Sequence, residues 1–530
     1  MKLKLNSLEL FFYFFVWITK FRLQYSKLIL ITEILNENST LLQYLTDLQP
    51  GWNFLSRLKD VSDIEWASWK YYIQVSWYYL MLQFAISEFI RNKYKQNVLK
   101  YWYILSSMIL IILSMGMKQL MIVMVQPMLF FLILFMGGKK LTVWVTSVLL
   151  LLSYNSLKYK NFFWTFLDHE EIRDEEVYLA LLTVAWIELR CISYSIEYID
   201  SNKKIQHFKG KEVNTSFLNN KLSYQNLIDM LSYVLYLPLL YSGPVVLYED
   251  FERCFETKRE KLSLRLKGFV TDILIFITYT FLLELAFHYI YFFAMQNNME
   301  VRYSNSLSWV DQKVQVAFFH MKYVISYGVA AAFARMDHIQ PPPTPRCIAR
   351  IHVYSQMWRY FDVGLYRFLL KYIYIPGLTV VSGTCKLSIT SCKLIASLST
   401  FVFIFMWHGT IWDIFVWSIL NYIGITLEHL GTVLSESDQY EWFKRRVLKS
   451  DRMETRFVAL ICVPLLTLSA ISNFYLFAGN KVGNLFFKCF LQPSLKNSVI
   501  VGVSLYSCCQ VSMALEDMPS RTDVKQSELR

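Results

Sequence analysis

Apolar runs close to twenty residues long recur along the whole sequence, and they restrict the possible fold more than any other feature. A helix of about twenty apolar residues can cross the hydrocarbon core of a bilayer. Spanning segments must satisfy their own backbone hydrogen bonds, so runs of this length indicate helices rather than barrel strands. Residues are 55% hydrophobic and only 18% charged, against about 25% charged in soluble domains. The sequence therefore predicts an all-α polytopic membrane protein.

These runs predict about eleven or twelve transmembrane helices. Residues 1–516 are expected to form a single integral membrane domain, followed by a polar C-terminal tail at 517–530. Basic residues follow the first run without a small-residue cleavage site, which predicts a retained helix rather than a removed signal peptide. The candidate spans are 8–19, 70–90, 101–117, 119–136, 141–154, 177–195, 268–295, 313–335, 387–407, 411–430, 457–478 and 496–514.

Positive charge lies mainly in the short loops between the runs. The formal net charge is +12, but Lys and Arg beside spans set membrane topology, so nucleic-acid binding is not expected. The positive-inside rule assigns every basic loop to the cytosol, which leaves the glycosylation sequon at 38–40 in the lumen and the one at 214–216 in the cytosol. The basic loops are 91–100, 202–211, 253–267, 346–371 and 444–457.

One interval conflicts with simple alternation of spans. Between the loops at 202–211 and 253–267 lies a single apolar stretch, YVLYLPLLYSGPVVLY (233–248), interrupted by two prolines and a glycine. A segment that enters and leaves on one side resolves the conflict. Broken backbone at membrane depth is tolerated only where protein or a water-filled cavity surrounds it. The sequence thus predicts a re-entrant hairpin and an internal cavity.

A second unusual segment begins at RMDHIQPPPTPRC (335–347), whose three prolines should stop the preceding helix. The following stretch, MWRYFDVGLYRFLLKYIYIP (357–376), has apolar residues at helical spacing and basic residues on other faces, which predicts an interfacial or re-entrant amphipathic helix. Its basic face would suit the phosphates of a lipid or of coenzyme A. Ordinary juxtamembrane charge explains the same pattern equally well.

Several familiar chemistries lack their motifs. The nine cysteines include no CxxC pair and the eight histidines no HExxH, so neither a disulfide scaffold nor a zinc cluster is indicated. The sequence also contains no P-loop, no GxGxxG and no GxSxG. Nucleotide hydrolysis, dinucleotide binding and a serine-hydrolase elbow are therefore unsupported.

His408 is the main candidate for chemistry. It ends one apolar run in FMWHGTIWDIF (405–415), and Gly409 begins the next. An ionisable residue at membrane depth is costly, which makes it a functional candidate. A buried neutral imidazole can accept a proton near neutral pH. The alternative is a histidine that merely bonds to a neighbouring helix.

Four other residues are weaker candidates. Asp362 falls four residues after Trp358 on the same helical face, although a salt bridge with a nearby arginine would also explain it. Glu284 and His288, four apart, are expected to be structural and to pair with each other. Cys347 follows a cation that favours the thiolate, the form that ligates iron, although most isolated loop cysteines have no such role.

These residues alone are compatible with an enzyme, a proton-coupled transporter or a channel. In addition, the chain resembles the membrane-bound O-acyltransferase family, and within it the branch that acylates hedgehog proteins. The match runs in order from about residue 50 to about 515. Its motifs are DIEWASW (63–69), ISYSIE (192–197), YSGP (241–244), PPPTPRC (341–347), WRYFDVGL (358–365), YIYIP (372–376), WHG (407–409), NYIGITLE (421–428) and SNFYLFAGNKVG (472–483).

The resemblance implies a fold and an activity. The fold would enclose a through-membrane catalytic channel, with a catalytic core at about 225–480. The enzyme would transfer palmitate from palmitoyl-coenzyme A to the N-terminal cysteine amine of a secreted hedgehog-type protein, in the endoplasmic reticulum membrane or the Golgi. Growth-factor ligands are further possible acceptors. The alternatives are acylation of a protein serine or a lipid hydroxyl, a catalytically silent homologue, and a transporter, although no internal repeats are visible.

The resemblance also implies site residues. His408 matches the catalytic histidine and Asp362 the essential aspartate, without deciding which of them is the base. Trp358 and Asn473 match positions in the substrate cavity, with Asn473 expected near the thioester carbonyl. Cys347 matches the thiolate that holds the iron of a haem b, which would be structural rather than catalytic.

Overall fold

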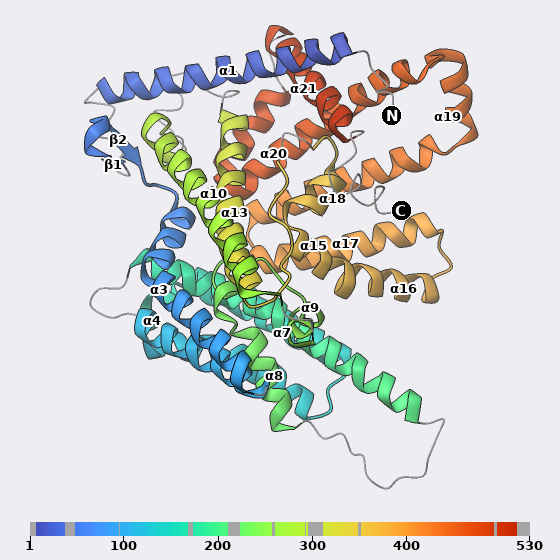
Figure 1. Cartoon of the computed structure of the whole chain (residues 1–530). Coiled ribbons are helices and arrows are strands. Elements are labelled where there is room, and N and C mark those ends of the chain that lie inside the picture. Colours follow the sequence, from blue (N-terminus) through green and yellow to red (C-terminus); the bar gives the residue numbers. More distant parts are fainter. Residues whose placement is uncertain are drawn as a thin grey trace.

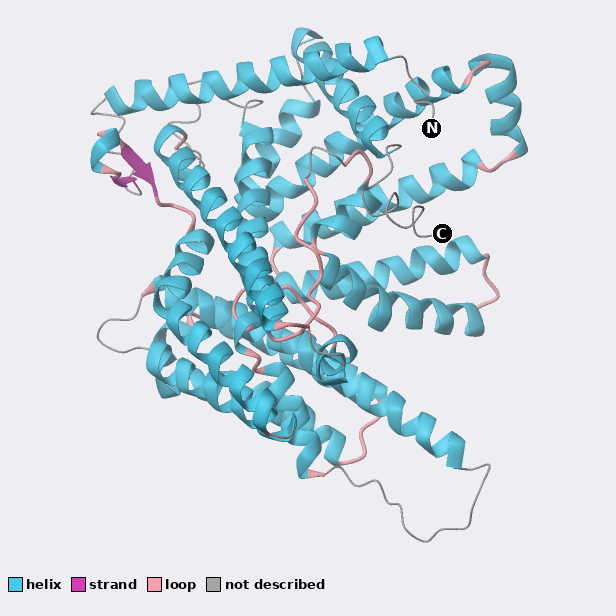
Figure 2. Ribbon diagram, viewed as in Figure 1, coloured by secondary structure: helices cyan, strands magenta, loops and turns pink. Residues whose placement is uncertain are grey.

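The computed structural model describes residues 7–37, 48–94, 96–167, 173–209, 223–256, 260–291, 293–294, 311–347, 351–491 and 495–516 (Figures 1 and 2). The predicted all-α class is confirmed, since strands in the described part of the chain form only one small antiparallel hairpin, β1 (Leu48–Pro50) with β2 (Leu58–Asp60). Both glycosylation sequons and the tail at 517–530 lie outside the described residues.

The described part of the chain is almost entirely helical. Its helices are α1 (Ser7–Glu37), α3 (Ile64–Lys93), α4 (Gln96–Phe135), α5 (Lys140–Tyr159), α6 (Phe162–Leu167), α7 (Asp174–Lys209), α8 (Tyr224–Val234), α9 (Tyr248–Glu256), α10 (Leu262–Tyr289), α13 (Asp311–Met336), α14 (Tyr354–Phe361), α15 (Val363–Leu369), α16 (Ile375–Thr384), α17 (Ile389–His408), α18 (Trp412–Ser435), α19 (Asp438–Phe443), α20 (Asp451–Leu491) and α21 (Leu495–Glu516), with 3₁₀ segments η1 (Asn53–Leu55) and η2 (Leu237–Leu239) and π-helical segments η4 (Leu370–Tyr374) and η5 (Lys444–Leu448).

Eight of the described helices are long and apolar enough to cross a membrane: α4, α5, α7, α10, α17, α18, α20 and α21. The predicted runs 101–117 and 119–136 both fall in α4, which bends at Gly116. The predicted spans 8–19, 70–90 and 313–335 lie in α1, α3 and α13, which are not among these eight when only the described residues are considered. In α13, Lys322 is buried and pairs with Asp63 at the start of α3 (2.9 Å). Paired polar groups thus replace part of the apolar surface there.

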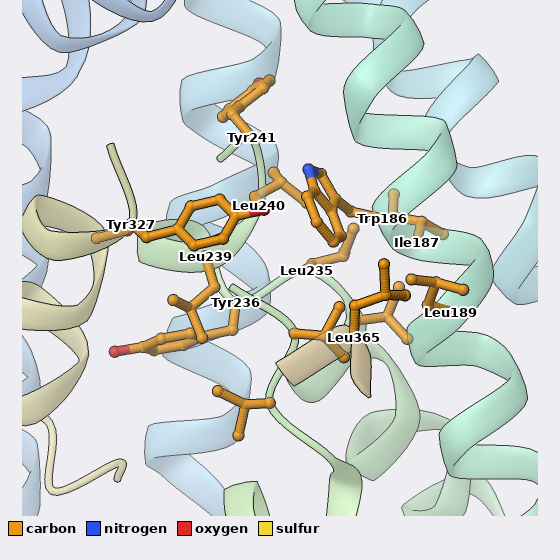
Figure 3. Packing of buried hydrophobic residues seen from close by; sticks show 14 of the residues in the cluster. Trp186, Ile187, Leu189, Leu235, Tyr236, Leu239, Leu240, Tyr241, Tyr327 and Leu365 are labelled. Atoms are coloured by element: carbon orange, nitrogen blue, oxygen red, sulfur yellow. The ribbon is translucent and has the colours of Figure 1, made fainter. Parts of the chain in front are cut away.

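Helix α7 lies at the centre of the fold, and 89% of the residues in its most apolar stretch are buried inside the protein. Trp186, Ile187 and Leu189 of α7 pack against the segment that follows α8, close to Tyr327 of α13 (Figure 3). The α16–α17 pair projects away from this centre as an antiparallel hairpin (Figure 1).

The predicted break and reversal at 233–248 are confirmed. Helix α8 stops at Val234, and α9 begins only at Tyr248. The Tyr233 hydroxyl donates to the Val246 carbonyl (2.7 Å), so the chain folds back on itself. Arg190 of α7 donates to the carbonyls of Val234 and Leu239, which the broken helix leaves free. The irregular backbone is therefore buried in protein, as its depth requires.

The three prolines stop a helix as predicted, because α13 ends at Met336. In contrast, the prediction of one continuous amphipathic helix at 357–376 is wrong. Helix α14 ends at Phe361, and Asp362 has a non-helical backbone (φ −123°, ψ 89°). Its side chain accepts from the Leu365 amide (2.8 Å) and so begins α15 as an N-cap. The new helix continues through η4 into α16.

Candidate active site

His408 occupies the junction between two spans, as the sequence indicated. Helix α17 ends there because Gly409 adopts φ 140°, ψ 142°, a conformation that residues with a side chain rarely take. The site also requires glycine sterically, because a Cβ on Gly409 would lie 2.6 Å from the Tyr159 hydroxyl oxygen. Helix α18 starts three residues later.

The His408 imidazole lies edge-on to the ring of Trp417 (5.0 Å between centroids, 81°). The residue is only half-buried, and no described side chain or backbone group forms a hydrogen bond with its ring nitrogens. The Lys158 ammonium of α5 is close enough to act on it electrostatically. Both ring nitrogens are therefore available to a bound molecule.

Trp417 brings the other predicted cavity residues to His408. Its indole nitrogen donates to Asn473 Oδ1 on α20 (3.3 Å), and its ring lies 5.7 Å from that of Trp358 on α14. The Trp358 indole nitrogen donates in turn to Asn421 Oδ1 (3.2 Å). Trp358, Asn473 and His408 thus surround one aromatic side chain, although they come from three different helices.

Asn473 keeps its donor group nearly free. Its Oδ1 is occupied by Trp417, whereas its Nδ2 lies 3.7 Å from the Met357 sulfur. A thioether is a weak hydrogen-bond acceptor. This amide can therefore donate to an oxygen that enters the site.

Asp362 has a different environment from the one predicted. It neither shares a helical face with Trp358 nor pairs with Arg359 or Arg367, because Arg367 binds Asp250 (2.7 Å). Its Oδ2 accepts from the Tyr327 hydroxyl (2.9 Å), and its Oδ1 accepts from the Leu365 amide. Burial raises the pKa of Asp362, while these bonds oppose the shift. Both carboxyl oxygens are already engaged.

Asp362 connects to His408 through aromatic rings. Tyr327, which donates to Asp362, lies 6.4 Å from Trp186, and Trp186 lies 5.4 Å from Trp407, the neighbour of His408. The Trp407 indole nitrogen donates to the Ala185 carbonyl on α7 (2.9 Å), which fixes the last turn of α17. The two candidate residues therefore belong to one packed network.

Glu284 and His288 contact each other as predicted, but through the backbone: His288 Nδ1 bonds to the Glu284 carbonyl (2.8 Å), while the Glu284 carboxylate binds other groups. Glu284 binds Lys59, Lys70 (3.1 Å) and the indole nitrogen of Trp66 (2.7 Å). His288 accepts from the Trp52 amide (2.9 Å). Both side chains hold the β1–β2 hairpin and the start of α3 against the end of α10.

Cys347 has an exposed and unpaired thiol in the described structure. The preceding Arg346 donates its amide to the Tyr360 carbonyl (2.9 Å) and places its guanidinium 4.3 Å from the centre of the Tyr360 ring. The loop is thus fastened to the end of α14. Among the described residues, no group of three or more His, Cys, Asp or Glu side chains could hold a metal ion.

The basic face predicted at 357–376 is largely neutralised. Arg367 binds Asp250 on α9, and Lys371 binds Glu197 on α7 (2.5 Å) and Glu249 on α9 (2.9 Å). These are ordinary pairs between neighbouring helices. Arg359, directly after Trp358, remains exposed.

Four residues of the network were not singled out from the sequence: Trp186, Tyr327, Trp417 and Asn421. Asn421 could have been recognised from the sequence, because it is a polar amide in an apolar span, four residues after Trp417. The others resemble ordinary aromatic core residues, and only the packing of α7, α13 and α18 reveals their contacts.

A family model described as the membrane-bound O-acyltransferase family matches residues 106–469. The chain therefore belongs to this family and is a multi-pass membrane acyltransferase. It is 28% identical over 482 residues to the protein-cysteine N-palmitoyltransferase Rasp of Drosophila melanogaster, with 89% of each chain covered. It is 30% identical over 295 residues to the protein-cysteine N-palmitoyltransferase HHAT of Mus musculus, which covers 54% of this chain and 57% of the relative. The mouse HHAT-like protein is 23% identical over 421 residues, with 78% and 76% covered.

Proposed function

We propose that the chain transfers palmitate from palmitoyl-coenzyme A to the N-terminal cysteine amine of a secreted, hedgehog-type signalling protein. Two relatives named as protein-cysteine N-palmitoyltransferases support this reaction class. The observation that carries the proposal is the unbonded His408 imidazole between two spans, near an Asn473 amide whose Nδ2 has only the weak Met357 thioether as its acceptor. The donor is made in the cytosol and the acceptor lies in the lumen, which fits an enzyme of the endoplasmic reticulum or Golgi membrane.

The proposed reaction is direct acyl transfer. The amine nitrogen bonds to the thioester carbon, the carbon–sulfur bond breaks, and coenzyme A leaves as the thiol. His408 takes the proton that the attacking amine loses and returns it to the leaving sulfur. Asn473 Nδ2 donates to the oxygen on which negative charge develops. No acyl-enzyme is required.

Asp362 is assigned a positioning role in this proposal. Its two oxygens hold Tyr327 and the first turn of α15, so accepting a further proton would disturb bonds that the fold uses. His408 has no such commitment and is the proposed base. Trp358 would line the acyl site, and the exposed Arg359 beside it is the proposed contact for a coenzyme A phosphate.

The proposal is tested by incubating purified protein with labelled palmitoyl-coenzyme A and peptides that begin with Cys, Ser or Ala. We expect label on the Cys peptide, in an amide that resists hydroxylamine. Label on a serine hydroxyl or on lipid would favour the alternative acyltransferases. Transfer to no acceptor would contradict the proposal.

We further propose that Cys347 binds the iron of a haem b. An exposed, unpaired thiol next to an arginine suits this role, and the porphyrin nitrogens would supply four of the iron ligands, so a single protein ligand would be sufficient. When bound, the haem would brace the loop at 341–347. We expect purified protein to show a Soret band that Cys347→Ala removes and Cys385→Ala retains. Identical spectra for the wild type and Cys347→Ala would contradict this assignment.

A further inference from the structure

Glu188 is a carboxyl group buried inside the membrane domain. It lies near the middle of the span in α7 and is 0% exposed. Neither of its oxygens has a hydrogen-bond partner among the described residues. A buried carboxylate is costly unless it is paired or neutralised, and an ionisable group in a span is a candidate for function.

The protein supplies no positive charge for Glu188 within the described chain. The cation nearest in sequence, Arg190, donates instead to the carbonyls of Val234 and Leu239. The Cys191 thiol on α7 itself is a titratable neighbour, and the facing group from α5 is Ser147, which does not titrate in this range. The carboxyl is therefore neutralised by a proton or by a cation taken from outside the protein.

Further polar oxygens lie at this depth. The Ser147 hydroxyl of α5 lies against the Glu188 carboxyl, is fully buried and has no hydrogen-bond partner among the described groups. Gln126 lies near the end of α4, at a similar depth to Ser147 near the start of α5. Its Oε1 is also buried and has no hydrogen-bond partner among the described groups. Helices α4 and α5 both pack on α7. Carboxylate, hydroxyl and amide oxygens are the ligands that hard cations prefer.

We propose that Glu188 is the centre of a membrane-embedded site for a small monovalent cation, H⁺ or Na⁺, with Ser147 and Gln126 as oxygen ligands. The site lies in the seam between the two helices that hold the end of α17. The end of α17 is held to α7 by the Trp407 indole nitrogen, which donates to the Ala185 carbonyl. It is held to α5 by Asn155, which donates to the Met406 carbonyl (2.8 Å). Cation occupancy would therefore tighten the seam beside the His408 junction. This inference does not depend on the acyl-transfer proposal.

The test compares thermal unfolding of purified wild type and Glu188→Gln. Sodium chloride is exchanged for choline chloride at constant ionic strength, between about pH 6 and pH 9. A sodium site raises the wild-type midpoint by about 2–4 °C as Na⁺ replaces choline. A proton site gives a similar rise on acidification, without a Na⁺ effect. Glu188→Gln carries a permanently neutral side chain and should lose either dependence.

Glu441→Gln is the matched control, because Glu441 is exposed on α19 and should keep the wild-type response. If Glu188→Gln does not fold, Ser147→Ala retains the carboxyl and should raise the cation concentration needed for half of the shift several-fold. Equal cation responses in the wild type and Glu188→Gln would overturn the proposal. So would a wild type that responds to neither cation, or a Ser147→Ala variant with an unchanged midpoint concentration.

Discussion

At the scale of single residues, His408 and Asp362 differ in whether their side chains already form hydrogen bonds within the protein. The imidazole has unbonded nitrogens, whereas both oxygens of the carboxyl accept hydrogen bonds within the protein. The sequence placed His408 at a break between spans, because Gly409 follows it directly. It could not show that Tyr327 reaches Asp362, because that contact joins α13 to the start of α15 and depends on tertiary packing.

The Tyr327→Phe substitution tests the positioning role of Asp362. It removes the hydroxyl that donates to Asp362 Oδ2 and leaves a buried acceptor without its partner, at a cost of about 1–3 kcal/mol. We expect the catalytic rate constant for palmitate transfer to fall about tenfold, with little change in KM for palmitoyl-coenzyme A. Tyr440→Phe is the control, because the Tyr440 hydroxyl of α19 also donates to a carboxylate, that of Glu454 on α20 (3.3 Å). A Tyr327→Phe variant with the wild-type rate constant would disprove the positioning role of Asp362.

At the scale of elements, sequence reasoning located most spans and the breaks at Gly116 and 233–248, but missed the break at Asp362. The predicted runs 177–195, 387–407, 411–430 and 457–478 lie within or close to α7, α17, α18 and α20, because apolar length alone defines such helices. The break at Asp362 was not predicted. A capping side chain decides it, and the apolar spacing on both sides of the break still resembles one helix.

Helix α21 is fastened to α14, the helix that carries Trp358. His352, just before α14, bonds through Nδ1 to the Ser512 hydroxyl (3.0 Å), and its Nε2 lies 3.8 Å from Glu516. Gln356 of α14 donates to Glu516 (2.5 Å). The C-terminal helix therefore supports one wall of the candidate site.

This contact should depend on pH. Burial lowers the pKa of His352 below its ordinary value of about 6.5, although Glu516 and Glu428 oppose the shift. A lowered pKa means that the unfolded chain binds the proton more readily, so stability is lost as pH falls below about 6.5. We expect the thermal midpoint to fall from pH 7 to pH 5.5 by less in His352→Asn than in the wild type. His429→Asn should retain the wild-type fall, and equal falls in all three proteins would disprove the contribution of His352.

At the scale of the whole molecule, the all-α class and the family were predictable, and the number of spans was less so. Eight described helices meet the length and apolarity of a span. One of them, α4, contains two predicted runs on either side of its break at Gly116, and charged side chains in α3 and α13 are paired inside the protein. Sequence composition does not show which polar side chains will be paired in the folded protein, so it cannot fix the number of spans. The orientation of the helices relative to the cytosol is predicted from the positions of the basic loops.

The predicted topology places the turn between α16 and α17 in the cytosol. Cys385 lies in this turn and is exposed, with Lys386 beside it. In sealed microsomes, whose outer face is cytosolic, a membrane-impermeant maleimide should label the wild type more strongly than Cys385→Ser. Labelling of Cys385 only after detergent treatment would reverse the assigned orientation of the domain.

The central claim is that His408 carries the acyl transfer. The most direct measurement compares wild type and His408→Ala for transfer of a clickable palmitate from its coenzyme A thioester to a peptide that begins with cysteine. A general base contributes about 10²–10⁴-fold to such a step, so we predict a loss of at least about 100-fold at an unchanged thermal midpoint. His429→Ala, on the next helix, should remain active. A folded His408→Ala variant with wild-type transfer would contradict the account.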